Sequence, residues 1–326
     1  MQLNKIYYGV VGAGHIGNYH AQQIQNIANV TLRGIYDVSL SQAQKTATTY
    51  NTLAFKSLGS LLKKCNVITI ATPANTHFNI AVQALKHNCH VFIEKPITTS
   101  LKDADDIIAL AQEKQLLVQV GHIERFNPAF VSLLKNKNVN RAQFIESERL
   151  TPFNLRGLDV NVILDLMIHD IDLILHIKQC PVKRIEAVGI KVLSRTIDLA
   201  NARIVFEDNS VANLTASRIS DTACRKLRVF NAQKYFSVDL QNHIINIYSV
   251  EDQPPKDEFS QLVFSSNNKF IVHQHKKVLK QNALYKELVS FIASIQTEKT
   301  TVVGAGAGRD AIKLALLIQE KVNEPN

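Results

Sequence analysis

The sequence predicts a two-domain α/β protein in which a doubly wound parallel sheet precedes a second α+β domain with a large, mostly antiparallel sheet. The chain has 326 residues, more than the ~100–200 of a usual domain. Up to Gly121, short apolar runs alternate with helical stretches, which is typical of a parallel sheet covered on both faces. After Gly121, strand-like runs follow one another, which indicates antiparallel pairing. We therefore expect domains at residues 1–121 and 122–326, with the last helix able to pack back on the first domain.

Each element of the first domain is predicted from apolar periodicity and its flanking residues. The helix that begins after Ser100 has Thr98, Thr99 and Ser100 as candidates for its N-cap. The expected strands are residues 6–11, 30–36, 67–71, 91–93 and 117–120, and the expected helices include residues 15–26, 78–87 and 101–114.

The second domain is predicted to hold one long amphipathic helix at residues 162–177, a shorter helix at 128–135 and two C-terminal helices at 284–295 and 309–322. One face of such a sheet needs a cover, either from its own helices or from another subunit. The expected strands are residues 142–148, 185–193, 202–206, 211–217, 227–230, 236–240, 244–250 and 270–273.

Composition excludes several classes of protein. Lys and Arg number 37 against 28 Asp and Glu, a formal charge of +9 that would suit nucleic acid, an anionic membrane or phosphorylated ligands. However, no basic segment with interleaved aromatic residues is present, and no apolar run reaches the ~18 residues that span a bilayer. The four cysteines lack the spacing of metal ligands. We expect a cytoplasmic protein without a metal site, a nucleic-acid partner or a membrane partner.

A glycine-rich motif at residues 12–17, GAGHIG, follows an expected strand and opens an expected helix. Gly12 permits the tight turn, Gly14 lets a pyrophosphate approach the backbone, and Gly17 lets helix and strand pack closely. The helix N-terminus would bind the phosphates. Asp37, 20 residues after Gly17, would accept hydrogen bonds from the ribose hydroxyls and repel a 2′-phosphate. The motif predicts a Rossmann domain that binds NAD rather than NADP.

Two further segments follow expected strands and would face the same crevice, because ligands bind outside the carboxyl ends of a doubly wound sheet. They are ATPANTH at residues 71–77 and EKP at residues 94–96. Lys95 would lie beside the nicotinamide and donate to a substrate oxygen, although a surface lysine in a tight turn explains the residue equally well. The predicted cofactor-binding residues are Gly12, Gly14, His15, Ile16, Gly17, Asp37, Thr72, Pro73, Asn75, His77, Glu94 and Lys95.

Asp165 and His169 are four residues apart in an expected helix, so they share one face. A carboxylate one turn from a histidine can fix its tautomer and raise its basicity, which suits general acid–base chemistry near neutral pH. Taken alone, the two residues could equally well be a structural pair that hydrogen-bond to each other within a helix interface.

Together and in this order, residues 12–17, 71–77 and 94–96 and the pair Asp165 and His169 resemble the Gfo/Idh/MocA oxidoreductase family, and the resemblance covers essentially the whole chain. It implies a Rossmann domain followed by a substrate domain whose open sheet is used in oligomerisation, giving a homodimer or a homotetramer. It also implies that Lys95, Asp165 and His169 are the catalytic groups. Whether Lys95 or His169 is the general base stays open.

A narrower resemblance is carried by residues 121–128, 164–172 and 212–218. They are similar to the branch of the family that acts on nucleotide sugars, in particular to enzymes that oxidise C3 of UDP-N-acetylglucosamine to a ketone for lipid A precursors. The alternatives are a free sugar or an inositol as substrate, and a regulator that senses NAD(H) without catalysis. Arginine suits a diphosphate because its planar guanidinium can donate two parallel hydrogen bonds. The predicted substrate contacts are Lys95, Arg125, Asn127, Arg156, Asp165 and His169.

Overall fold

The computed structural model describes residues 5–153, 160–255 and 259–324. Its contacts divide the chain into two compact units, Met1–Ile123 with Asn282–Ile312, and Glu124–Gln281 with Lys313–Asn326. The sequence-based division after Gly121 leaves residues 282–312 to the second domain, whereas their contacts lie in the first unit. The reason is hydrophobic: α8 (Ala283–Thr297) contributes Leu288, Phe291 and Ile292 to the core beneath β1 (Ile6–Val11).

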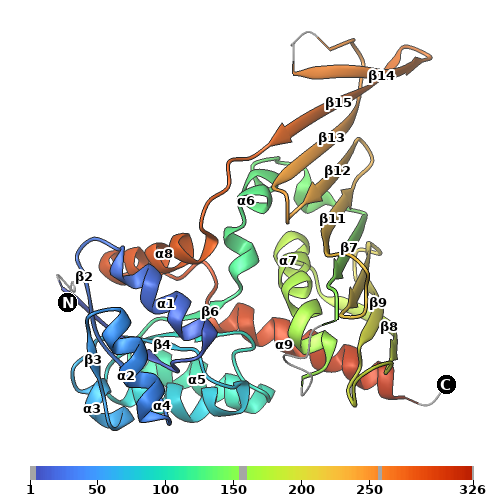
Figure 1. The fold of residues 1–326 in the computed structure, drawn as a ribbon. Helices are drawn as coiled ribbons and strands as arrows, with labels where there is room; N and C mark the ends of the chain where they lie inside the picture. The colour runs from blue at the N-terminus through green and yellow to red at the C-terminus, as the bar shows by residue number, and fades with distance from the viewer. Residues whose placement is uncertain (1–4, 154–159, 256–258, 325–326) are drawn as a thin grey trace. The chain divides into compact units, whose positions relative to one another are not determined.

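The first unit is built on a six-stranded parallel sheet with the strand order β3-β2-β1-β4-β5-β6 (Figure 1). The order reverses between β1 and β4, which is where doubly wound sheets bind ligands at the strands' carboxyl ends. The predicted parallel doubly wound sheet is therefore confirmed. Its strands are β1, β2 (Val30–Tyr36), β3 (Leu53–Ala54), β4 (Val67–Ile70), β5 (His90–Glu94) and β6 (Val118–Gly121). Its helices are α1 (His15–Gln25), α2 (Leu40–Thr49), α3 (Leu58–Leu62), α4 (His77–Lys86), α5 (Leu101–Glu113) and α8, with a 3₁₀ turn at Ala74–Thr76.

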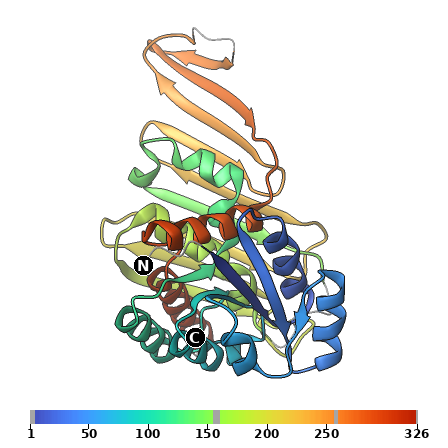
Figure 2. The same ribbon diagram turned by 90° about the vertical axis from the view of Figure 1, so that its left-hand side faces the viewer.

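The second unit is built on a nine-stranded sheet with the order β14-β15-β13-β12-β11-β7-β10-β9-β8. Among the described strand pairs of this sheet, only β7 and β10 run in parallel, so the predicted mostly antiparallel sheet is also confirmed. β14 and β15 form the edge that extends away from the helices of this unit (Figure 2). The strands are β7 (Phe144–Leu150), β8 (Val182–Ile190), β9 (Leu199–Phe206), β10 (Val211–Ser217), β11 (Cys224–Phe230), β12 (Lys234–Asp239), β13 (Ile244–Glu251), β14 (Ser260–Ser266) and β15 (Lys269–Lys277).

The helices of this unit lie on one face of the sheet and bury alternate residues of its strands, such as Ile204 and Leu214. Because strand side chains alternate between faces, the intervening residues form a second face. An aromatic row crosses that face, in which neighbouring ring centroids lie 4.4–5.5 Å apart. The row consists of Phe144, Phe230, Tyr235, Tyr248 and His273. The helices are α6 (Pro128–Leu134), α7 (Ile168–Lys178) and the C-terminal part of α9 (Ala305–Asn323), with 3₁₀ turns at Ile123–Phe126 and Val139–Arg141.

Candidate active site

The glycine motif forms the turn between β1 and α1, and two of its glycines have no room for a side chain. Gly12 has a φ of +101°, and a Cβ on it would lie 2.3 Å from the Ala71 carbonyl oxygen. A Cβ on Gly17 would lie 1.8 Å from the Gly12 carbonyl oxygen. At Gly14, in contrast, a Cβ would meet nothing within 4 Å, so the surface beside the helix N-terminus is open. This combination fits a cradle that a phosphate can approach.

The N-terminus of α1 offers donors to such a phosphate. In the described part of the chain, no side chain caps α1 at Gly14. The first N–H groups of a helix have no partner within the helix, and the helix dipole places partial positive charge on them. His15 and Ile16 are exposed at this end of the helix. The residues present therefore fit the pyrophosphate of a dinucleotide.

Asp37 lies directly after β2, beside the glycine turn. Its Oδ2 accepts a hydrogen bond from the Ala13 N–H at 2.7 Å, and its Oδ1 accepts one from the Ser39 N–H at 2.8 Å. The side chain is only half-buried, and each carboxylate oxygen can accept a further bond. The carboxylate is thus fixed in place with acceptor capacity left for ribose hydroxyls.

The segment after β4 is held by His77 at the start of α4. His77 is buried, with Nδ1 2.9 Å from the Pro96 carbonyl oxygen and Nε2 2.9 Å from the Thr72 carbonyl oxygen. Burial lowers the pKa of this histidine. His77 therefore ties the segment after β4 to the segment after β5, while Pro73 and Asn75 are exposed.

Glu94 and Lys95 lie at the end of β5, both half-buried. The Oε1 atom of Glu94 is 2.7 Å from Nε2 of His20, a fully buried residue of α1. Burial alone favours the neutral acid, but the His20 bond and the charges of His20 and Lys95 hold the pKa of Glu94 below its usual value. The first unit thus brings residues 12–17, 37, 72–77 and 94–95 to the carboxyl edge of one sheet. His20 was not predicted from the sequence.

Asp165 and His169 lie where a π-helical turn, Ile163–Met167, continues into α7. The turn is anchored by Asn161, whose Oδ1 accepts from the N–H groups of Ile163 and Leu164, both at 3.0 Å. Both predicted residues are half-buried and so remain accessible. A single π turn within an α-helix is frequent at functional sites.

Arg125 and Asn127 are engaged within the second unit. The buried guanidinium of Arg125 donates from Nε and Nη2 to the two carboxylate oxygens of Asp172, at 2.5 and 2.9 Å. Asn127 caps α6 and donates to Glu124 and to the Leu240 carbonyl oxygen, both at 2.9 Å. Their expected contacts with substrate stay predictions. Arg156, the remaining predicted contact, lies outside the described residues.

Glu124 belongs to a neighbouring buried network. Arg149 donates to both carboxylate oxygens of Asp170, at 2.7 and 3.0 Å, and to Glu124 at 2.9 Å. Although burial opposes its ionisation, the Arg149 charge and hydrogen bond keep the pKa of Glu124 below its usual value. These paired charges stabilise the packing of α7 against β7.

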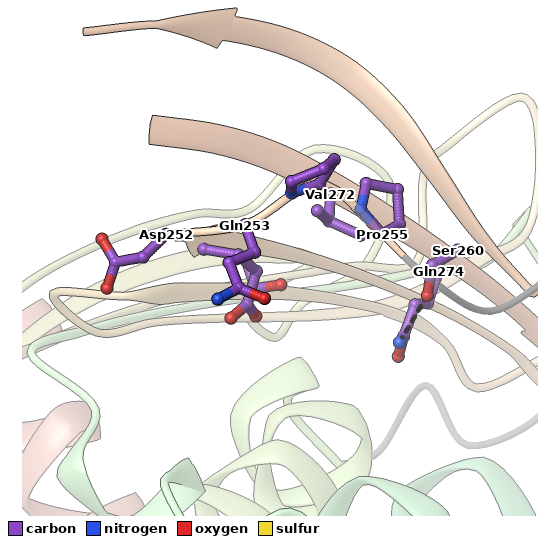
Figure 3. A pocket seen from close by; sticks show the side chains of 9 residues that line it. Asp252, Gln253, Pro255, Ser260, Val272 and Gln274 are labelled. Atoms are coloured by element: carbon purple, nitrogen blue, oxygen red, sulfur yellow. Dashed lines mark hydrogen bonds between the residues drawn. The ribbon is translucent and has the colours of Figure 1, made fainter. Parts of the chain in front are cut away.

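Two surface cavities lie away from the predicted residues. One of 430 Å³ is lined by β13, β14, β15 and the segment after β13, and there Gln274 donates to Ser260 at 2.9 Å (Figure 3). Another, of 590 Å³, lies in the first unit and is lined in part by Arg33, Lys63 and Lys64. Neither includes a residue predicted for the active site. Among the residues that the structure describes, no group of three or more His, Cys, Asp or Glu is placed to hold a metal ion, and none of the helices found there is long and apolar enough to cross a membrane.

Comparison with known proteins tests the family prediction. Residues 6–122 match the model of an oxidoreductase family with an NAD-binding Rossmann fold. Over 96% of both chains, the protein is 34% identical to UDP-N-acetylglucosamine 3-dehydrogenase of Acidithiobacillus ferrooxidans. The chain belongs to the Gfo/Idh/MocA family. It is therefore an NAD-dependent dehydrogenase, which confirms the predicted enzyme class and cofactor.

Solved structures of other dehydrogenases resemble this chain. The structure of the Acidithiobacillus ferrooxidans enzyme matches with a TM-score of 0.88 at 32% identity, covering 98% of each chain. Scyllo-inositol dehydrogenase of Lactobacillus casei, solved with NAD(H) and scyllo-inositol, matches with a TM-score of 0.77 at 19% identity, covering 97% of this chain and 96% of that one. The second likeness shows the shared fold alone.

Proposed function

We propose that this dehydrogenase oxidises the C3 hydroxyl of UDP-N-acetylglucosamine to a ketone. The observation that carries the proposal is the similarity to the Acidithiobacillus ferrooxidans enzyme, which extends over 96% of both sequences and gives a TM-score of 0.88. An inositol substrate has weaker support, because myo-inositol 2-dehydrogenase of Thermotoga maritima is only 22% identical over 97% of this chain.

Bound NAD⁺ supplies the acceptor for the hydride that leaves the carbinol carbon. The α1 N-terminus binds the cofactor's phosphates, and Asp37 accepts hydrogen bonds from its ribose. His169, oriented by Asp165, takes the hydroxyl proton, so that the alcohol loses one hydride and one proton. The Lys95 ammonium donates a hydrogen bond to the same oxygen and stabilises its developing negative charge, a contribution of ~3–4 kcal/mol in a dry site.

A substrate panel tests this proposal. The purified protein is supplied with NAD⁺ and, separately, with UDP-N-acetylglucosamine, UDP-glucose, free N-acetylglucosamine and myo-inositol, and NADH formation is followed by absorbance. We expect the highest kcat/KM with UDP-N-acetylglucosamine. Turnover confined to free sugars or inositol would assign the protein to another branch of the family. No turnover with any substrate would favour an NAD(H)-sensing regulator.

We also propose that a second copy of the chain packs on the sheet face that carries the aromatic row. An exposed apolar residue continues this surface at the sheet edge: Phe264 of β14 pairs with Ile271, which shares the face of His273, and is 59% exposed. Large exposed apolar patches mark interaction sites, and a sheet face on which none of the described helices lies is suited to a symmetric partner. Light scattering should give a dimer or tetramer, and the Tyr248→Glu variant should shift it toward the monomer. A monomeric wild-type protein would contradict this.

A further inference from the structure

His20 connects the helix that begins at the glycine motif with the residue that precedes Lys95. We propose that His20 is a positioning residue: by fixing the Glu94 carboxylate, it sets the position and the electrostatic surroundings of Lys95. The proposal rests on the role proposed above for Lys95.

The imidazole is held in one orientation. His20 is 0% exposed, and its ring lies edge-on to Phe92, with centroids 5.0 Å apart and planes at 66°. Its Nδ1 has no hydrogen-bond partner among the described residues, whereas Nε2 lies 2.7 Å from Glu94. An ionised carboxylate only accepts, so Nε2 carries the proton. Burying this polar ring is costly unless it is hydrogen-bonded, and the described chain gives it the bond to Glu94.

The carboxylate is confined on its other side as well. Glu94 pairs with Gly121 across β5 and β6. A Cβ on Gly121 would lie 3.0 Å from Oε2 of Glu94, so the glycine leaves the space that the carboxylate occupies. Glu94 is thus placed between a donor from α1 and the backbone of β6.

The charges around the carboxylate keep it ionised. Burial favours the neutral form of Glu94, but the bond and charge of His20, followed by the charges of Lys95 and His77, lower its pKa. Lys95 follows Glu94 directly in the chain. Without the His20 donor, the half-buried carboxylate would be freer to turn toward the Lys95 ammonium. That contact would withdraw the ammonium from the substrate oxygen.

The helix α1 therefore has two roles in this proposal. Its first turn offers N–H groups to the cofactor phosphates, and one further turn places His20 against the segment that carries the lysine. A merely structural histidine would affect stability alone. A positioning histidine affects kcat more than the KM for NAD⁺, and it can be replaced by another donor of the same reach.

The test compares His20→Phe with His20→Gln. Phenylalanine keeps the packing against Phe92 without a donor, whereas glutamine offers an N–H near the position of Nε2. We expect His20→Phe to lower kcat about 10- to 100-fold, as misplacement of a catalytic group does, while the KM for NAD⁺ changes little. His20→Gln should recover most of the lost kcat. An unchanged kcat in His20→Phe, or equal losses in both variants, would overturn the proposal.

Two further variants keep the test decisive. If His20→Phe does not fold, Glu94→Gln removes the charge with little change in shape, and it should lower kcat to a similar extent; a wild-type kcat there would overturn the proposal. In a Lys95→Ala background, His20→Phe should cause no additional loss, because coupled residues are not additive. An additional full loss would show that His20 acts independently of Lys95. A fully active Lys95→Ala variant would instead refute the proposed role of Lys95, and the assay uses whichever substrate the panel identifies.

Discussion

The carboxylate of Asp37 accepts a hydrogen bond from the backbone N–H of Ala13 at 2.7 Å, which joins the end of β2 to the glycine turn after β1. One acidic residue therefore fixes the glycine turn, and we expect the same carboxylate to accept hydrogen bonds from the ribose hydroxyls of the cofactor. We therefore expect the preference for NAD⁺ over NADP⁺ to depend on the side chain that also fixes the geometry of the turn.

Asp37→Asn should separate these two roles. The amide oxygen can still accept from Ala13, so the glycine turn is kept, while the bond from the Ser39 N–H and the negative charge that repels a 2′-phosphate are lost. We expect weaker NAD⁺ binding and a smaller ratio of kcat/KM for NAD⁺ over NADP⁺. An unaltered ratio would reject a role for Asp37 in discrimination.

Gly14 and Gly17 form a matched pair for testing the cradle. Gly17→Ala places a Cβ 1.8 Å from a backbone oxygen, so overpacking should destabilise the protein by about 1–3 kcal/mol or more. Gly14→Ala meets no protein atom within 4 Å and should cost less than about 1 kcal/mol. Its methyl group would nevertheless obstruct the phosphates, weakening NAD⁺ binding about tenfold. Urea unfolding and cofactor titration measure the two effects, and normal NAD⁺ binding by Gly14→Ala would argue against the cradle.

Removal of the Lys95 ammonium should affect chemistry rather than cofactor binding. Lys95→Met is expected to lower kcat about 10²- to 10³-fold, the usual effect of deleting one donor to a developing oxyanion, with a nearly unchanged dissociation constant for NADH. His169→Gln should lower kcat to a similar extent, and raising the pH should not restore it. Wild-type turnover in both variants would show that neither Lys95 nor His169 takes part in the reaction.

Arg125 distinguishes a structural role from substrate binding. Breaking its buried pair with Asp172 through Arg125→Met should destabilise the protein by about 3–5 kcal/mol. The exposed pair of Arg184 and Glu186, at 3.2 Å, provides the control, since Arg184→Met should cost about 0–1 kcal/mol. If Arg125→Met instead kept full stability and raised the KM for the nucleotide sugar, the predicted substrate contact would be correct.

The lowered pKa of Glu124 predicts how the stability of the fold depends on pH. Its pKa in the folded protein lies below the ordinary value of 4.5, so its ionisation stabilises the fold above that value. The contribution is lost as the pH falls through 4.5 toward the folded pKa. Urea midpoints measured between neutral pH and acid should therefore fall less steeply in Glu124→Gln than in the wild type. Parallel curves for the two proteins would contradict this.

Local sequence was sufficient to predict the type of both sheets and most of their strands, because most strands are apolar runs between regular connections. The expected strands at residues 6–11 and 30–36 coincide with β1 and β2. Other elements were not predicted: β3 has two residues, and β14 is exposed along most of its length, so neither has a pattern of burial to detect. The expected helix at residues 162–177 is present, but its first turn is a π-helix, and five residues are too few to distinguish the two periods.

The site shows the same division between local and long-range information. The glycine motif and Asp37 could be located from spacing alone. The engagement of Arg125 with Asp172 and of Asn127 with the Leu240 carbonyl depends on residues 47 and 113 positions away, which no local pattern reveals. His20 had one signal, its position three residues after Gly17 on the inward side of α1.

Oxidation at C3 is tested most directly with UDP-N-acetylglucosamine that carries deuterium at C3 of the sugar. We expect deuterium to appear at C4 of the nicotinamide in the reduced cofactor, and turnover to be no faster than with unlabelled substrate. Reduced cofactor without deuterium would show that another carbon is oxidised. The absence of any reduced cofactor, from a folded protein that binds NAD⁺, would contradict the proposed reaction itself.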